Sequence, residues 1–112
     1  MTDEEFNALA MSLPEVTYAD HFGRGAYKVA GKKLFGGPSS TRDGKGILKL
    51  TPEQQEMMCA AEPTIFASPG GTWGSQGWTE FTVATADEAT ARSALWAAWK
   101  NAASKTLLKK HA

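Results

Sequence analysis

Residues 21–37 read HFGRGAYKVAGKKLFGG, and this stretch decides how the chain folds. Two short runs that favour strands, Ala26–Ala30 and Lys33–Gly36, flank Gly31, a residue that permits a tight turn. Side chains alternate between the two faces of a strand, so Tyr27 and Val29 share one face. We predict a β-hairpin with Tyr27 and Val29 directed into the core. Three side chains of the hairpin are expected in water: Lys28, Lys32 and Lys33.

His21 and Phe22 stand just before this hairpin and are expected to anchor its start. His21 is the only histidine inside the predicted folded region, because His111 lies in the tail. No second histidine or cysteine stands at a spacing that suits a metal, so no metal site is predicted. We interpret His21 as structural.

Length and composition indicate one domain covering residues 1–112, with 42% hydrophobic and 21% charged residues. The single cysteine, Cys59, excludes an internal disulfide and suits a reducing compartment. The acidic start MTDEEFNALAMSL does not resemble a signal peptide, and no apolar run is long enough for a membrane span. We expect a cytoplasmic, monomeric protein that does not bind a membrane.

Three capping patterns predict three helices, each with a threonine followed three residues later by Glu or Gln. The pairs are Thr2 with Glu5, Thr51 with Gln54, and Thr85 with Glu88. Pro14 and Glu62-Pro63 end the first and second helices. The second helix is expected to direct Met57, Met58 and Ala61 inward. Trp96 and Trp99 on the third are assigned to the core.

Further strands are predicted at Gly46–Leu50, Thr64–Ser68 and Trp78–Ala84, and PGGTWGSQG at 69–77 is interpreted as a loop too glycine-rich for a regular element. The order is therefore α-β-β-β-α-β-β-α, with residues 105–112 as a frayed tail. We predict an α+β fold, a two-layer α/β sandwich with a mostly antiparallel sheet. The helices are expected on one face of the sheet, and the other face is expected to be open. That open face would carry Lys28, Lys49, Trp78, Glu80 and Thr82.

Four blocks of sequence, in this order along the chain, resemble the MmcQ/YjbR family: HFGRGAYKVAGKKLF, GILKLTPEQQEMMCAAEPTIF, WGSQGWTEFTV and ALWAAWKNAASKTL. The resemblance runs from about Phe6 to Leu108, and one departure is Ser104, where the family tail usually reads Pro-Lys. It implies a two-layer fold similar to the bacterial frataxin homologue CyaY. It also implies DNA binding through a proposed double-wing arrangement, and it brings no catalytic residues.

The charges indicate where DNA would bind. Residues 1–20 hold five acids and no base, for a net charge of −5, and residues 21–50 hold one acid and seven bases, for +6. Residues 51–91 hold six acids and no base, for −6, and residues 92–112 hold five bases and no acid, for +5. Phosphates require clustered Lys and Arg, and exposed aromatic rings stack on bases. The candidate nucleic-acid or ligand residues are Arg24, Lys28, Lys32, Lys33, Lys49, Trp73 and Trp78, with Arg42 and Lys45 in the same basic block. With a pI near 6.7 and no basic helix for the major groove, binding is expected to be weak, electrostatic and insensitive to sequence.

A second hypothesis is a small-ligand or protein-interaction module that uses the open face and the WGSQGW loop. In a third, Trp73 and Trp78 only cover the sheet edge. Proximity of both tryptophans to the basic residues would favour an anion-binding surface, whereas burial of both rings would favour the covering role. We find no nucleophile elbow and no phosphate-binding glycine loop, so we predict neither enzymatic activity nor a cofactor.

Overall fold

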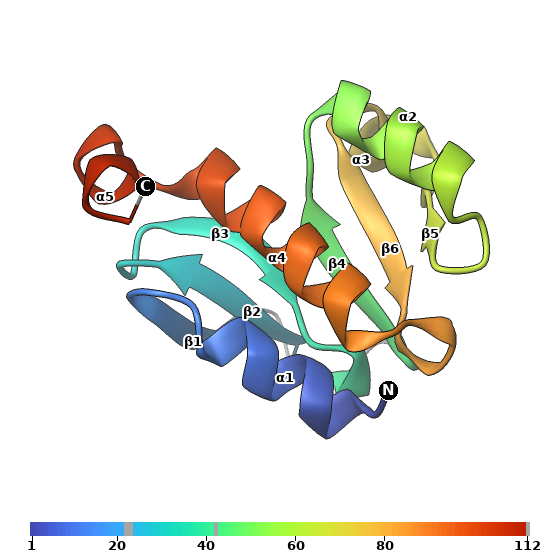
Figure 1. Ribbon diagram of the computed structural model, residues 1–112, viewed down its shortest axis with the longest axis horizontal. Helices are drawn as coiled ribbons and strands as arrows, with labels where there is room; N and C mark the ends of the chain where they lie inside the picture. The colour runs from blue at the N-terminus through green and yellow to red at the C-terminus, as the bar shows by residue number, and fades with distance from the viewer. Residues whose placement is uncertain (22–23, 42, 112) are drawn as a thin grey trace.

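The structure, a computed structural model, describes residues 1–21, 24–41 and 43–111. The predictions for Phe22, Arg42 and the His21 side chain lie outside this description. Helices and strands follow one another as α1 (Asp3–Met11), β1 (Val16–His21), β2 (Arg24–Val29), β3 (Lys33–Gly37), β4 (Lys45–Lys49), α2 (Pro52–Ala61), β5 (Phe66–Ala67), α3 (Gly71–Ser75), β6 (Trp78–Thr82), α4 (Glu88–Ala102) and α5 (Lys105–Lys110) (Figure 1). Short 3₁₀ turns stand at Ser39–Thr41 and Val83–Thr85.

The strands form one antiparallel sheet in the order β1-β2-β3-β4-β6-β5. The first four strands are neighbours in both sequence and space, whereas β6 returns to lie between β4 and β5. The predicted hairpin is present as β2 and β3. Its turn residues Ala30 and Gly31 both have positive φ (53° and 68°), and the Lys32 N–H donates to the Val29 carbonyl over 3.0 Å. A turn with two consecutive residues of positive φ has a backbone twist that matches the twist of the paired strands.

A bulge in β3 supplies the core with an additional aromatic ring. Tyr27 pairs with Gly36 while Lys28 pairs with Leu34, so Phe35 is an extra residue on its strand. A bulged residue leaves the regular alternation. Phe35 is fully buried beside Tyr27, with ring centroids 5.9 Å apart.

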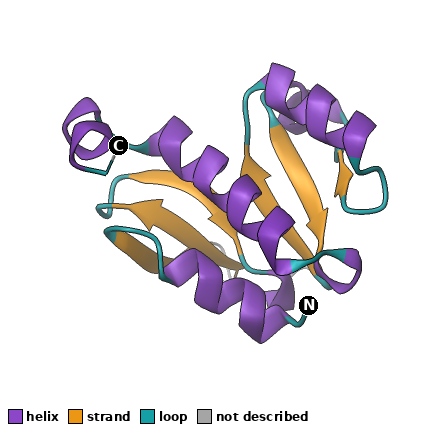
Figure 2. Ribbon diagram, viewed as in Figure 1, coloured by secondary structure: helices purple, strands orange, loops and turns teal. Residues whose placement is uncertain are grey.

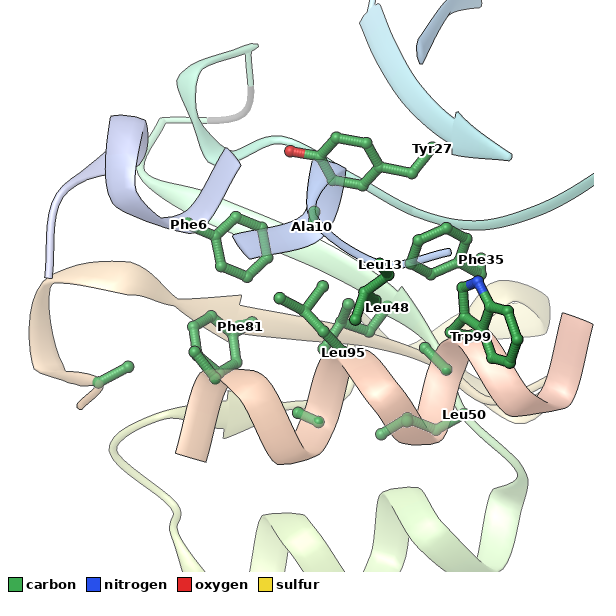
Figure 3. Packing of buried hydrophobic residues seen from close by; sticks show 14 of the residues in the cluster. Phe6, Ala10, Leu13, Tyr27, Phe35, Leu48, Leu50, Phe81, Leu95 and Trp99 are labelled. Carbon is green, nitrogen blue, oxygen red and sulfur yellow. The ribbon is translucent and has the colours of Figure 1, made fainter. Parts of the chain in front are cut away.

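Helices α1, α4 and α2 lie on the same side of the sheet (Figures 1 and 2). Between α1, α4 and the sheet lies the core, which includes Phe6, Leu48, Phe81, Leu95 and Trp99 (Figure 3). Tyr27 and Val29, predicted to face the core, are buried, and so are Leu48, Leu50, Phe81 and Val83. The α+β prediction, with an antiparallel sheet and its main helices on one face, is confirmed. No helix in the described ranges is long and apolar enough to cross a membrane.

Strand β1 is absent from the predicted order and is the main correction to the predicted fold. All six of its residues pair with β2, from Val16 opposite Val29 to His21 opposite Arg24. Because β1 is an edge strand, Tyr18 remains 50% exposed and Val16 is half-buried. The alternation between apolar and polar residues that marks the inner strands is therefore weak here.

Several predicted boundaries are also corrected. The strand expected at Thr64–Ser68 shortens to Phe66–Ala67, and the one expected at Trp78–Ala84 ends at Thr82. The N-cap of α4 is Asp87, while the Thr85 hydroxyl donates instead to the Thr64 carbonyl over 2.6 Å.

Two regions expected to be irregular are helical. The glycine-rich stretch contains α3, and the tail expected to fray forms α5. The Ser104 side chain caps α5, and Leu107 and Leu108 pack against the core.

Helix α2 lies more at the surface than predicted. None of its residues 52–61, all within the described ranges, is fully buried. Met58 packs against the core, but Met57 is 64% exposed and Ala61 is also exposed. Polar contacts therefore contribute to its position, as described below.

Candidate functional site

The face of the sheet opposite α1 and α4 carries the predicted mixture of cations and aromatic rings. Residues directly paired across two strands share a face. Lys49 pairs with Trp78, Ile47 with Glu80 and Lys45 with Thr82, and all six alternate with the core residues Leu48 and Phe81. On β2, Arg24 and Lys28 alternate with the buried Tyr27 and so lie on this face as well. We call this surface the open face.

Trp73, Trp78 and Lys49 form a contact cluster on the open face, which we call the tryptophan ledge. The two indole rings stack with centroids 5.3 Å apart and an interplanar angle of 22°. The Lys49 ammonium lies 5.8 Å from the centroid of the Trp78 ring and donates a hydrogen bond to the Gln76 carbonyl. Trp73 is 50% exposed and Trp78 is half-buried. The ledge therefore presents an aromatic surface to solvent beside a cation.

Close backbone approach holds α3 in this position. Gly77 has a φ of +101°, and a Cβ there would lie 1.9 Å from the Leu50 carbonyl oxygen. At Gly74 a Cβ would lie 2.4 Å from the Ser68 hydroxyl. The Gln55 side-chain amide of α2 lies within 3.1 Å of the Gly74 carbonyl, the Trp78 carbonyl and the Thr79 hydroxyl. The segment that contains α3 is thus held by its close approach to the chain at the end of β4 and by the Gln55 side chain of α2.

A pocket of about 400 Å³ opens beside the ledge, and we call it the α3 pocket. Its lining residues are Arg24, Asp43, Lys45, Gly46, Ile47, Pro69, Trp73 and Glu80. Trp73 lines this pocket, whereas Trp78, on which it stacks, does not. Trp73 therefore connects the pocket to the tryptophan ledge.

The other predicted site residues are less closely grouped. Lys28 lies on β2, two strands away from β4, which corresponds to about 10 Å. Lys32 is exposed in the hairpin turn. Lys33 lies beside Lys49 in a second pocket, of about 340 Å³, at the end of the sheet. The structure thus joins Lys49, Trp73 and Trp78 directly and Arg24 through the α3 pocket, but it does not bring Lys28 and Lys32 to them.

Glu80 lies on the face predicted for it but was not among the predicted site residues. Its position two residues after Trp78, on a strand that alternates, was the available signal. Asp43, Ile47 and Pro69 were also missed, because only tertiary structure brings their segments together.

Within the described residues, no group of three or more His, Cys, Asp or Glu side chains could hold a metal ion. Burial raises the pKa of the Cys59 thiol above its ordinary value. The thiolate fraction of Cys59 is therefore reduced, which suits a residue packed against the core rather than a nucleophile.

The fold and the site define a class of protein: an α+β domain with an antiparallel sheet, covered by helices on one face and bearing an aromatic and cationic cluster on the other. Neither a family model nor a curated protein sequence matches this chain. A structural match exists to the crystal structure of protein DR2400 of Deinococcus radiodurans, described as a DUF419 domain. The match has a TM-score of 0.74 and 21% sequence identity, and it covers 97% of this chain and 86% of the other. The DUF419 domain is that of the MmcQ/YjbR family, so the fold expected from the resemblance is confirmed.

Proposed function

We propose that this chain is a member of the MmcQ/YjbR family and a non-enzymatic domain that binds DNA weakly, preferring single strands to duplex. The tryptophan ledge is the observation that carries the proposal. Unstacked bases stack on exposed aromatic side chains, and nearby cations neutralise phosphates. Trp73 is 50% exposed and stacks on Trp78, and Lys49 lies over the Trp78 ring, so the ledge provides both features.

The shape of the surface favours single strands over duplex. Trp73 stands in a five-residue helix packed on the open face, and Lys49 and Trp78 lie on neighbouring strands. An exposed ring can stack only on a base whose face is free, which in duplex DNA is covered by its neighbours. The proposed site therefore differs from elements that read base edges in the major groove.

We further propose that the domain acts as a cytoplasmic monomer. Its cytoplasmic part is supported by the single cysteine of the chain, which suits a reducing compartment.

The test is a titration with a short DNA strand and with the duplex of the same sequence, followed by fluorescence anisotropy and tryptophan emission. We expect a Kd for the single strand of about 10⁻⁴–10⁻⁶ M at physiological salt, which is the non-specific range. Affinity should fall with added salt, and Lys49→Ala should reduce the salt slope by about 0.7 if Lys49 neutralises one phosphate of a single strand. Trp73→Leu should weaken single-strand binding about 5- to 100-fold through lost stacking.

Tyr18→Leu is the matched control, because Tyr18 is also 50% exposed but lies on β1 away from the ledge. It should bind DNA like the wild type. Absence of binding at low salt, or tighter binding of duplex than of the single strand, would refute the proposal. Binding of a small ligand by the same surface would then become the leading hypothesis.

A further inference from the structure

The α3 pocket combines charges of both signs, which a site built only for phosphate does not need. Two cations, Arg24 and Lys45, and two carboxylates, Asp43 and Glu80, line it. In the described part of the chain the one ion pair joins Arg92 to Glu88, so none of these four groups is neutralised by a described partner within 4.0 Å. Carboxylates repel phosphates, and their presence on a DNA-binding face calls for a ligand that also donates hydrogen bonds.

The walls of the pocket suit a planar ring. Trp73 stacks on Trp78 and also lines the pocket, so part of its aromatic surface is available to a ligand there. Ile47, only 5% exposed, supplies an apolar surface beside Glu80, its cross-strand partner. A volume of about 400 Å³ lies within the range of small-molecule sites, about 300–1,000 Å³. Aromatic and aliphatic walls with a few polar groups are typical of sites that hold a base.

We propose that the α3 pocket selects a guanine base, with Glu80 as the residue that reads it. This inference rests on the proposed function and names its preferred ligand. A carboxylate has two acceptor oxygens and no donor. The Watson–Crick edge of guanine offers two adjacent donors, N1–H and N2–H, one for each oxygen of the carboxylate. On the other bases a donor is followed by an acceptor, which would repel the second carboxylate oxygen.

Glu80 is positioned for this role by β6. It is half-buried, on the same strand face as Trp78 and directly across from Ile47. Arg24 and Lys45, both exposed, lie around the same pocket and can take the phosphate attached to the bound nucleotide. Such a pocket adds one base-selective position to a surface that otherwise binds through phosphates and stacking.

The test compares three nine-nucleotide strands at low salt: all thymine, thymine with one central guanine, and thymine with one central inosine, which lacks the N2 amino group. The guanine strand should bind on the order of tenfold more tightly than the all-thymine strand, with the inosine strand between them. Glu80→Gln should abolish this preference. It should also strengthen binding of the all-thymine strand, since one negative charge is lost, whereas a folding defect would weaken binding of every strand.

Glu56→Gln, which removes an exposed carboxylate from α2, is the matched control and should keep the guanine preference. Equal affinities of the wild type for the three strands, or a preference that survives in Glu80→Gln, would overturn the inference while leaving the proposed function intact. Guanosine and adenosine monophosphates are titrated separately. If no DNA strand binds but guanosine monophosphate binds selectively and this binding depends on Glu80, only the proposed DNA-binding function is overturned. If neither the strands nor the guanine nucleotide bind, the proposed function and the guanine inference are both overturned.

Discussion

Gly77 shows at the scale of one residue why the tryptophan ledge needs its glycines. Its φ of +101° lies in a region that residues with a Cβ rarely occupy, and its Cα faces the Leu50 carbonyl. The Leu50 N–H in turn donates to the Gly77 carbonyl over 3.1 Å. A side chain at this position would separate the loop from β4 and move Trp78, the next residue.

Gly77→Ala should therefore destabilise the protein far more than Gly31→Ala. At Gly31 φ is also positive (+68°), but no atom lies within 4 Å of the position of a Cβ. Gly31→Ala should cost only the left-handed backbone penalty, about 1–2 kcal/mol. Gly77→Ala adds an overlap with backbone at 1.9 Å, and we expect it to cost at least about 2 kcal/mol more. Urea denaturation of both variants measures the difference, and equal losses would contradict the packing described for the loop.

At the scale of elements, one side chain connects α2 to the ledge. Because no residue among 52–61, all of them described, is fully buried, α2 depends strongly on the contacts of Gln55 with Gly74, Trp78 and Thr79. Gln55→Leu keeps a similar volume and removes these bonds. We expect a loss of about 1–3 kcal/mol in the free energy of unfolding, together with faster amide hydrogen exchange in α3.

Met57→Leu is the control on the same helix, since Met57 is 64% exposed. It should leave both the free energy of unfolding and the exchange of α3 close to those of the wild type. If Gln55→Leu behaves in the same way, α2 is held chiefly by its apolar contacts.

The N-terminus of α1 gives stability a dependence on pH. Hydrogen bonds from the Thr2 N–H and hydroxyl hold the pKa of Glu5 below its ordinary value. The stabilisation is therefore fully present above the pKa of the unfolded chain, about 4.3, and is lost as the pH falls through the lower pKa of the folded state. Glu5→Gln should flatten the decline in melting temperature over that interval. Glu4→Gln, which removes a charge from the same turn but leaves the capping box, should retain more of the decline.

Local signals predicted the elements that depend on local chemistry. The capping boxes at Thr2 and Thr51 are present, and alternation placed Tyr27 and Val29 correctly in the core. The error at β1 has a different origin, because an edge strand that is exposed on much of its surface lacks a buried stripe. Helix α3 was missed since its intrinsic propensity is poor and its position depends on contacts made by Gln55.

The candidate site was likewise predicted where it depends on local sequence and missed where it depends on tertiary contacts. Period-two alternation was sufficient to place Lys49 and Trp78 on the open face. The stacking of Trp73 on Trp78 could not be predicted, because it depends on how α3 returns over the sheet.

At the scale of the whole molecule, the blocks of charge in the sequence do not become separate patches. Glu80 belongs to the acidic block 51–91, yet it lies in a pocket with Arg24 and Lys45 from the basic block 21–50. The pairing of β4 with β6 brings these distant segments together. Charge along the chain therefore indicated the basic residues of the site but not Glu80.

The two edges of the sheet differ in their capacity to recruit another chain. Strand β5 has only two residues, whereas β1 has six, enough to template the addition of a further strand. Asp20 is the acidic residue within β1 and opposes such growth through charge. Asp20→Val should shorten the lag time of fibril formation in thioflavin fluorescence. Glu62→Val, which makes the same exchange at an exposed position after α2, should not, and equal acceleration by both variants would locate the aggregation-prone segment elsewhere than β1.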